Sequence, residues 1–436
     1  MNRNFFKPSR RAVLTFLGLG GVSAVLPARL MAAESPPPNL TAKAGDIVLR
    51  PGQMASPAWT VEARPQSLRF RRGTTVELGL ANELPGAVAF GWRGLGRVPT
   101  SEPLTGQPAL APGGRVKLTV PVTQSGTGLC DIRLLADGAA APARGVPLIV
   151  DESEPVNVDR DEIFLIEDWR VKADGAALPP GIDPKDAPTI FTVNGASTVD
   201  IPVRRHQRIR LRFINGCQRM IVAVKIADLD VRVMAIDGQP AEPFSARNGA
   251  LVLPPGGRTD VFIDISATAA ATTAILLHDG TTARPIGSLV TSSEPPVRSA
   301  SLPPAPALPG NGLPDKLELK GAARVELALD GPDWVPPQKF STASPPAFQA
   351  KIGRVAVLAL TNRARTSTVF HLHGHHFRLL DRLDDGWKPY WLDTLALEPG
   401  QTQRIAFAAE TPGRFLIESM ATDWAAPRLV RCYEVR

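Results

Sequence analysis

The chain contains few of the residues that mark several common classes of protein. It has only three cysteines among 436 residues, and their odd number and wide spacing exclude a disulfide framework. We therefore expect Cys130, Cys217 and Cys432 to be isolated structural thiols. The six methionines are scattered, which excludes a methionine-rich metal-binding segment. The sequence also lacks a glycine-rich phosphate loop, a Gly-x-Ser-x-Gly elbow and a Cys-x-x-Cys pair.

The positive net charge of +7 does not indicate a nucleic-acid-binding protein. Residues 1–33 contain no acidic residue and carry the basic residues Arg3, Lys7, Arg10, Arg11 and Arg29. Without this segment the net charge falls to roughly +2, which is a weak electrostatic footprint for a phosphate polymer. We expect no nucleic-acid partner.

Residues 1–33 are typical of an export signal. The pair Arg10-Arg11 precedes an apolar stretch that ends near Leu26, and small residues follow at Ala32-Ala33. The stretch is too short and too rich in glycine to span a membrane. The pair resembles a twin-arginine signature, although Val13 and Thr15 replace the usual Phe and Lys; the alternative is a signal for unfolded export. We expect twin-arginine export to the bacterial periplasm and no integral membrane protein after signal removal.

The remainder of the sequence is typical of an all-β protein. Short runs that alternate apolar and polar residues, such as Leu68–Arg71 and Arg208–Asn215, are separated by many of the 43 prolines and 37 glycines. Val355–Leu360 reads as a buried strand. No long helical period occurs. We predict three β-sandwich domains at residues 40–150, 151–290 and 315–436, with a linker at 291–314 that contains seven prolines.

Four of the six histidines lie in the sequence Phe-His-Leu-His-Gly-His-His-Phe that begins at Phe370. On a strand, alternation would place His371, His373 and His375 on one face, and His376 on the other. Imidazoles spaced in this way are suitable ligands for copper or zinc. We expect the other two histidines to be surface or turn residues: His206 and His278.

This histidine segment resembles the final domain of the multicopper oxidases, which contains His-Pro-x-His-Leu-His-Gly-His. Similar matches extend over the chain at Asn82–Pro85, Gly91–Gly94, Gly126–Arg133, Val193–Gly195, Arg208–Asn215, Asp237–Pro240, Pro255–Asp260, Leu397–Gly400 and Thr411–Phe415. The resemblance implies three cupredoxin-like Greek-key β-sandwich domains in tandem.

Most copper ligands of that family are replaced in this chain. The histidines of the first two motifs fall on Gly91, Arg93, Asp131 and Arg133, while the third motif keeps His371 and His373. The type 1 histidine of the third motif falls on Thr368. The His-Cys-His of the fourth motif falls on Glu418-Ser419-Met420, its last histidine on Trp424 and its axial methionine on Leu429, so the ligand cysteine is absent. Arginine carries a fixed positive charge that repels copper ions. We therefore expect no four-copper oxygen reduction.

Two questions about the remaining polar residues stay open, each with two interpretations. His371 and His373 could hold a single copper or zinc ion with Asp131 or Glu418 nearby, or they could persist as hydrogen-bonded residues at a domain interface. Likewise, Arg93 and Arg133 could fill the space left by copper and pair with the two acids, or they could extend into solvent.

The sequence is also similar to the FtsP (SufI) group, copper-free members of the same superfamily that are exported by the twin-arginine system and act in cell division. That similarity implies a non-catalytic periplasmic scaffold for cell-division or envelope assemblies, with protein partners and no cofactor. The alternatives are a copper-binding or copper-handling protein with one copper ion at His371 and His373, and an oxidoreductase with a reduced metal site.

Overall fold

The computed structural model describes residues 38–436 apart from residues 51, 65–67, 95–97, 267–269 and 382–385. The export signal expected at residues 1–33 therefore lies outside the described residues. Strands predominate, and the helices of the described residues are single 3-10 turns: η1 (Pro99–Ser101), η2 (Arg133–Leu135), η3 (Arg247–Gly249) and η4 (Pro337–Lys339). Among these residues no helix has the length and apolar character needed to cross a membrane.

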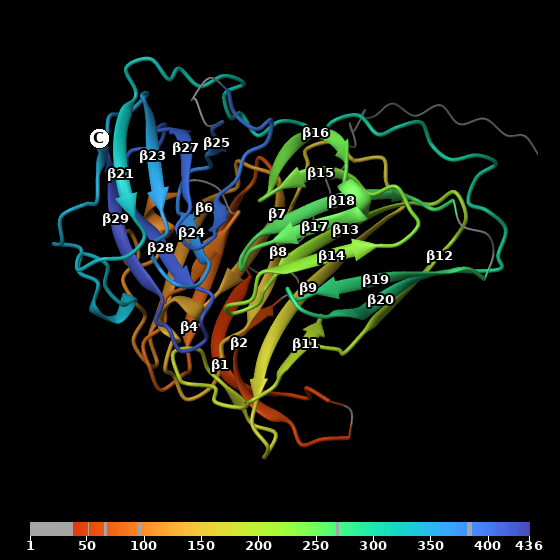
Figure 1. Ribbon diagram of the computed structural model, residues 1–436, viewed down its shortest axis with the longest axis horizontal. Helices are drawn as coiled ribbons and strands as arrows, with labels where there is room; N and C mark the ends of the chain where they lie inside the picture. Colours follow the sequence, from red (N-terminus) through yellow and green to blue (C-terminus); the bar gives the residue numbers. More distant parts are fainter. Residues whose placement is uncertain (1–37, 51, 65–67, 95–97, 267–269, 382–385) are drawn as a thin grey trace, which may run out of the picture. The chain divides into compact units, whose positions relative to one another are not determined.

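The first domain contains two four-stranded sheets (Figure 1). One sheet consists, in spatial order, of β2 (Ser56–Arg64), β1 (Asn39–Ile47), β4 (Thr75–Asn82) and β6 (Arg115–Pro121). The other consists of β3 (Leu68–Arg71), β8 (Gly145–Asp151), β7 (Gly126–Asp131) and β5 (Gly91–Arg93). Apolar side chains from both sheets, including Leu40, Leu80 and Leu148, form one buried core.

The second domain contains a seven-stranded and a five-stranded sheet. The larger sheet consists of β10 (Ala177–Leu178), β9 (Arg160–Val171), β13 (Arg208–Asn215), β18 (Arg258–Asp264), β15 (Arg232–Ile236) and β16 (Gln239–Ser245), with β11 (Thr189–Val193) also paired to β9. The smaller sheet consists of β12 (Val199–Val203), β20 (Ala283–Thr291), β19 (Thr272–His278), β14 (Val222–Ile226) and β17 (Ala250–Leu253). Ile209, Leu211 and Phe213 of β13 enter the core between the sheets.

The third domain contains a four-stranded and a five-stranded sheet. The first consists of β21 (Ala323–Ala328), β23 (Val355–Thr361), β27 (Thr402–Ala408) and β25 (Arg378–Leu379). The second consists of β22 (Gln349–Ala350), β29 (Leu429–Val435), β28 (Gly413–Ala421), β24 (Thr368–Leu372) and β26 (Thr394–Leu397). Their shared core includes Leu358, Phe370 and Phe415.

The same mixed pairing recurs in all three domains. In one sheet of each domain two strands run parallel, namely β1 with β4, β9 with β13 and β21 with β23. In the other sheet the parallel pairs are β3 with β8, β12 with β20 and β22 with β29. This repetition indicates three copies of one sandwich topology, as the sequence analysis expected.

The proline-rich segment between the second and third domains packs against its neighbours. No strand is assigned between the end of β20 and the start of β21. Ala305 and Leu308 join a small apolar cluster with Met234 and Phe262 of the second domain. The side chain of Asn311 accepts a hydrogen bond from the backbone N–H of Ser125 at 2.9 Å. The linker is thus fixed to the first and second domains.

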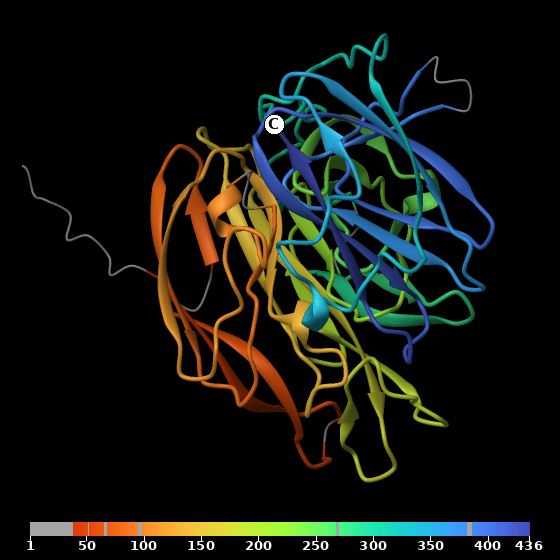
Figure 2. The same cartoon turned by 90° about the vertical axis from the view of Figure 1, so that its left-hand side faces the viewer.

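Buried arginines connect the three sandwiches, which Figures 1 and 2 show in orange, green and blue. Arg212 on β13 donates to Thr127 Oγ1 in the first domain at 2.8 Å. Arg258 on β18 donates to both carboxylate oxygens of Asp393 in the third domain, at 2.8 and 2.7 Å. Charged hydrogen bonds of this kind hold neighbouring domains in a defined orientation.

Candidate functional site

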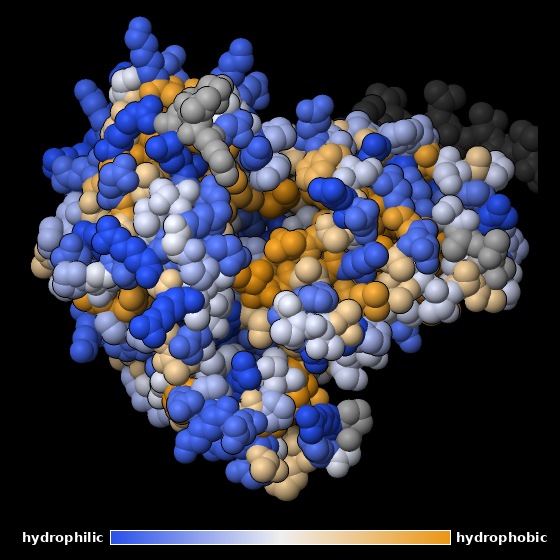
Figure 3. Space-filling model, viewed as in Figure 1, coloured by the Kyte–Doolittle hydropathy of each residue, from blue (hydrophilic) through white to orange (hydrophobic). Residues whose placement is uncertain are grey.

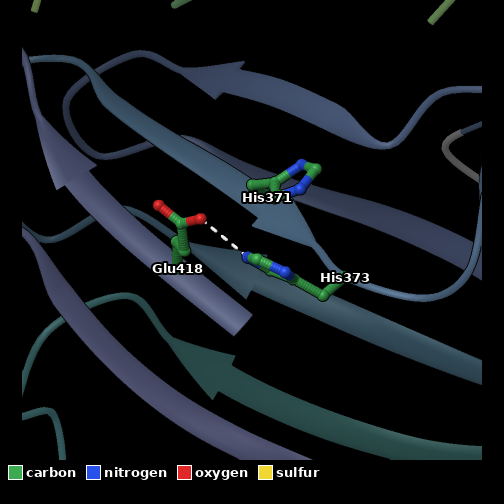
Figure 4. A group of neighbouring side chains, drawn as sticks. All are labelled: His371, His373 and Glu418. Atoms are coloured by element: carbon green, nitrogen blue, oxygen red, sulfur yellow. Dashed lines mark hydrogen bonds and ion pairs between the residues drawn. The ribbon is translucent and has the colours of Figure 1, made fainter. Parts of the chain in front are cut away.

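The sheet of the third domain brings His371 opposite Glu418. Within that sheet β24 lies between β26 and β28, and the register pairs His371 with Thr394 on one side and Glu418 on the other. The strand ends at Leu372, and Gly374 adopts a left-handed conformation with φ +72°. The rings of His371 and His373 nevertheless remain adjacent, with centroids 4.6 Å apart (Figure 4).

The expectation that His375 shares a face with His371 and His373 is wrong. After Gly374 the chain turns, and the ring of His375 packs on Phe407 and Phe415 in the core of the third domain. His375 Nδ1 lies 2.7 Å from the Tyr433 hydroxyl. The strand period fails because regular alternation ends with β24.

The other three histidines are located as the sequence analysis expected. His376 points to a different environment, and its Nε2 lies 2.9 Å from the backbone oxygen of Asp237. His206 occupies a turn with φ +62°, and His278 accepts from the N–H of Gly280 at an exposed strand end. The three cysteines are buried and unpaired, which confirms the prediction of isolated thiols.

His371 is a neutral ring with one free acceptor position. Its Nδ1 lies 2.9 Å from the backbone oxygen of Asp393 and 3.0 Å from Thr394 Oγ1. Because a carbonyl oxygen can only accept, Nδ1 carries the proton and Nε2 keeps its lone pair. Burial, together with the positive charge of Arg93, lowers the pKa of His371 to about 3.

His373 has the opposite charge state. Nε2 lies 2.7 Å from Glu418 Oε1, and Nδ1 lies 3.2 Å from Glu102 Oε2. Burial opposes a charge here, but the hydrogen bonds to Glu102 and Glu418 prevail and raise the pKa of His373 to about 9. At neutral pH both nitrogens therefore donate, and neither offers a lone pair to a metal ion.

Glu418 is a buried carboxylate that contacts three cationic groups. Besides His373, it binds Arg93 through Nη2 at 3.2 Å and Arg428 through a close contact to Oε2. Burial would raise the pKa of Glu418, but the charges of Arg428 and Arg93 hold it well below its ordinary value. This carboxylate is ionised throughout the neutral range.

Asp131 and Arg133 form a second ion pair. Arg133 Nε and Nη2 donate to Asp131 Oδ2 at 2.9 and 2.6 Å, and Nη1 donates to the backbone oxygen of Gly216 at 2.8 Å. Burial opposes ionisation of Asp131, but Arg133 and Arg93 lower its pKa. The structure thus places the four residues in two pairs, Arg93 with Glu418 and Arg133 with Asp131, and all four are buried.

One small metal-ligand group is present among the described residues. His371, His373 and Glu418 each offer one ligand atom, and these atoms lie within 4.8 Å of one another (Figure 4). The adjoining cavity, which Arg93 also lines, has a volume of ≈ 20 Å³. A water needs roughly 10–15 Å³, so this space accommodates one small species.

Three of the positions that correspond to ligands of type 1 copper carry neutral, hydrogen-bonded side chains. Thr368 Oγ1 donates to Asn362 Oδ1 at 3.0 Å, and Ser419 Oγ donates to the backbone oxygen of Leu329 at 2.5 Å. Trp424 Nε1 donates to the backbone oxygen of Pro179 at 3.0 Å. No thiolate or imidazole is available at these positions.

Sequence reasoning missed three residues of the site. Glu102, Asp393 and Arg428 all contact the histidines or Glu418. Arg428 directly precedes the expected axial-ligand position Leu429, so the sequence alone could have indicated a positive charge beside the site. Glu102 and Asp393 lie outside the matched motifs, and only the tertiary fold brings them close.

Comparisons with known proteins show what this arrangement is similar to. Two multicopper oxidase family models match residues 162–284 and 314–436. Multicopper oxidase MmcO of Mycobacterium tuberculosis is 23% identical over 410 residues, covering 79% of this chain and 76% of that protein. Laccase-3 of Oryza sativa subsp. japonica is 26% identical over 266 residues, covering 53% of this chain and 42% of that protein.

Solved structures show the same fold. A multi-copper oxidase from Pseudomonas thermotolerans matches with a TM-score of 0.78 and 25% identity, covering 91% of this chain and 98% of that one. Lac15 from a marine microbial metagenome matches with a TM-score of 0.76 and 24% identity, covering 92% and 100%. These similarities confirm the all-β, cupredoxin-like fold.

Proposed function

We propose that this chain, which belongs to the multicopper oxidase superfamily, is a non-catalytic member that keeps the three-domain architecture without oxygen reduction. The observation that carries this proposal is the contact of Arg93 and Arg428 with Glu418. Two guanidinium groups occupy the surroundings of the only histidine pair that remains from the family's copper motifs. A fixed cation at this point opposes the binding of further cations.

The residues present do not fit the four copper ions of the superfamily. At the histidine pair, His373 is protonated between two carboxylates, and the adjoining cavity of ≈ 20 Å³ is too small for a cluster. At the type 1 position, Thr368, Ser419 and Trp424 replace the soft sulfur and imidazole ligands. These residues therefore supply no type 1 copper site that could accept electrons from a substrate.

We further propose that the chain acts in the periplasm as a scaffold for cell-division or envelope assemblies. The twin-arginine resemblance of residues 1–33 and the similarity to the FtsP (SufI) group support this role. Ion pairs between domains also support it, because Arg258–Asp393 and Arg93–Glu418 would hold the three sandwiches as one platform for partner proteins.

Metal content and turnover test the loss of catalysis. Mature protein is loaded with Cu(II), washed, and measured for copper and for oxygen-dependent oxidation of a phenol. We expect less than one copper per chain and no turnover above buffer. Four copper ions per chain with oxidation of the phenol would contradict the proposal. In-cell crosslinking that recovers division or envelope proteins would support the scaffold role, and their consistent absence would count against it.

The metal-ligand group favours a second candidate, a protein that binds one copper or zinc ion. His371, His373 and Glu418 can converge on an ion if His373 loses its proton and Glu418 exchanges a guanidinium for the metal. Retention of one ion per chain, lost when His371 and His373 are both replaced by Gln, would favour this candidate over the scaffold.

A further inference from the structure

An apolar groove opens between the second and third domains. It has a volume of ≈ 360 Å³ and lies in the hollow where hydrophobic residues gather near the centre of Figure 3. Its lining includes the aliphatic residues Ile236, Val252, Leu379, Leu392 and Leu395. This volume falls within the range of binding sites, unlike the cavity at the histidines.

Two edge strands border the groove. β17 ends one sheet of the second domain, β26 ends one sheet of the third, and each pairs with a single described strand. Ala250–Leu253 and Thr394–Ala396 line the groove along these strands. An edge strand presents backbone N–H and C=O groups that can pair with another chain.

Both strands lack the usual protection of an edge. Natural edges carry charges or proline that prevent pairing with other chains. Among the described edge strands of four or more residues, only β11, β17 and β26 have neither. Three of the five residues of β11 are buried, whereas Val252 on β17 is 71% exposed. The unprotected edges therefore meet at this groove.

The rim of the groove adds aromatic surface and one unpaired charge. The rings of Phe244 and Tyr390 stack across the two domains with centroids 6.4 Å apart, and Phe244 is 39% exposed. Arg247 also lines the groove, is exposed, and forms no ion pair with another described residue. An apolar segment with a neighbouring acidic residue would match these features.

We propose that this groove binds an extended apolar segment of a partner protein, which adds a strand to β17 and places an acidic residue near Arg247. The proposal deepens the scaffold function, on which it rests, by naming the surface that receives a partner. β17 contains four residues. Both strands of a pair advance by roughly 3.3 Å per residue, so β17 can pair with about three or four residues of the segment. Their alternate side chains would enter the groove beside Leu395.

A phage-displayed library of random short peptides, panned on the mature chain, tests the proposal. We expect enrichment of alternating apolar sequences with an acidic residue, and hydrogen exchange should show protection of the amides of β17. Val252→Arg should weaken binding of a synthetic selected peptide by at least about tenfold. Val48→Arg, at a site that is 53% exposed and does not line the groove, is the matched control and should bind normally.

Three outcomes would overturn the groove assignment: no enrichment, equal binding to wild type and Val252→Arg, or a wild-type dimer that this substitution dissociates. The last result would identify a second copy of the chain as the occupant. None of these outcomes bears on copper content or turnover, so the groove can fail while the loss of catalysis stands. If the chain instead proves to be an oxidase, peptide binding at β17 remains measurable.

Discussion

The ring of His373 bridges two carboxylates from different domains, with Nε2 at 2.7 Å from Glu418 and Nδ1 at 3.2 Å from Glu102. Glu418 belongs to β28 of the third domain, whereas Glu102 follows η1 in the first. Arg93 and Arg428 add two further cations to Glu418. The charges at this interface therefore depend on one another.

Glu418→Gln should destabilise the fold strongly. It removes the negative charge shared by His373, Arg93 and Arg428 and leaves buried cations without compensation, which costs roughly 3–5 kcal/mol. Urea unfolding followed by tryptophan fluorescence measures the change. Glu83→Gln is the control, because its Arg115 contact is exposed and 4.0 Å long. Equal stability of the two variants would refute a central role for Glu418.

Stability should fall as the pH rises because of His373. Its pKa is about 9 in the folded chain against an ordinary value of 6.5. The protonated ring therefore stabilises the fold fully below about pH 6.5, and this contribution of about 3 kcal/mol is lost towards pH 9. The difference in unfolding free energy between wild type and His373→Gln should shrink across that window. A difference independent of pH would show that the ring is not charged.

Arg93→Ala should increase the affinity for Cu(II). The substitution removes a positive charge 3.2 Å from Glu418 and frees the space beside Gly256, where the guanidinium packs. We expect at least about tenfold tighter binding by titration calorimetry, because repulsion of the metal falls in a buried site. Arg64→Ala, at a residue whose side chain is 77% exposed, should not change the affinity. Unchanged affinity in both variants would show that charge does not exclude the metal.

Gly374→Ala should lower stability by about 2–4 kcal/mol. The residue has φ +72°, and an added Cβ would lie 2.1 Å from the ring of Phe415. Gly353→Ala separates the two causes, because that glycine has φ +75° but no atom within 4 Å of an added Cβ. We expect a loss of only about 1 kcal/mol for this control. Equal losses in thermal unfolding would eliminate the steric contribution of Phe415.

Much of the fold could be predicted because local alternation specifies strands. The strand expected at Arg208–Asn215 is β13 with the same bounds, and the run that begins at Val355 forms β23. Alternation does not reveal what covers each face. The arginines of β13 are buried because carboxylates of other segments, among them Asp260 and Asp161, pair with them.

The site was only partly predictable for a related reason. Motif matching located His371, His373, Arg93 and Glu418, since each occupies or replaces a family ligand position. It could not pair Glu102 with His373, because those residues are 271 positions apart and no short pattern links them. The two histidines also differ in charge because of their tertiary neighbours. His371 is neutral beside a backbone carbonyl, whereas His373 is positively charged between two carboxylates.

The interface between the first and third domains carries its own counterions. In Arg93 and Arg428 the positive charge that balances Glu418 is covalently part of the polypeptide. A metal centre would instead make assembly depend on the supply of that metal. The folding of this chain should therefore not depend on copper. Growth without copper would not unfold it, and chelators would not destabilise it. Every molecule would leave synthesis with its interdomain charges already in place.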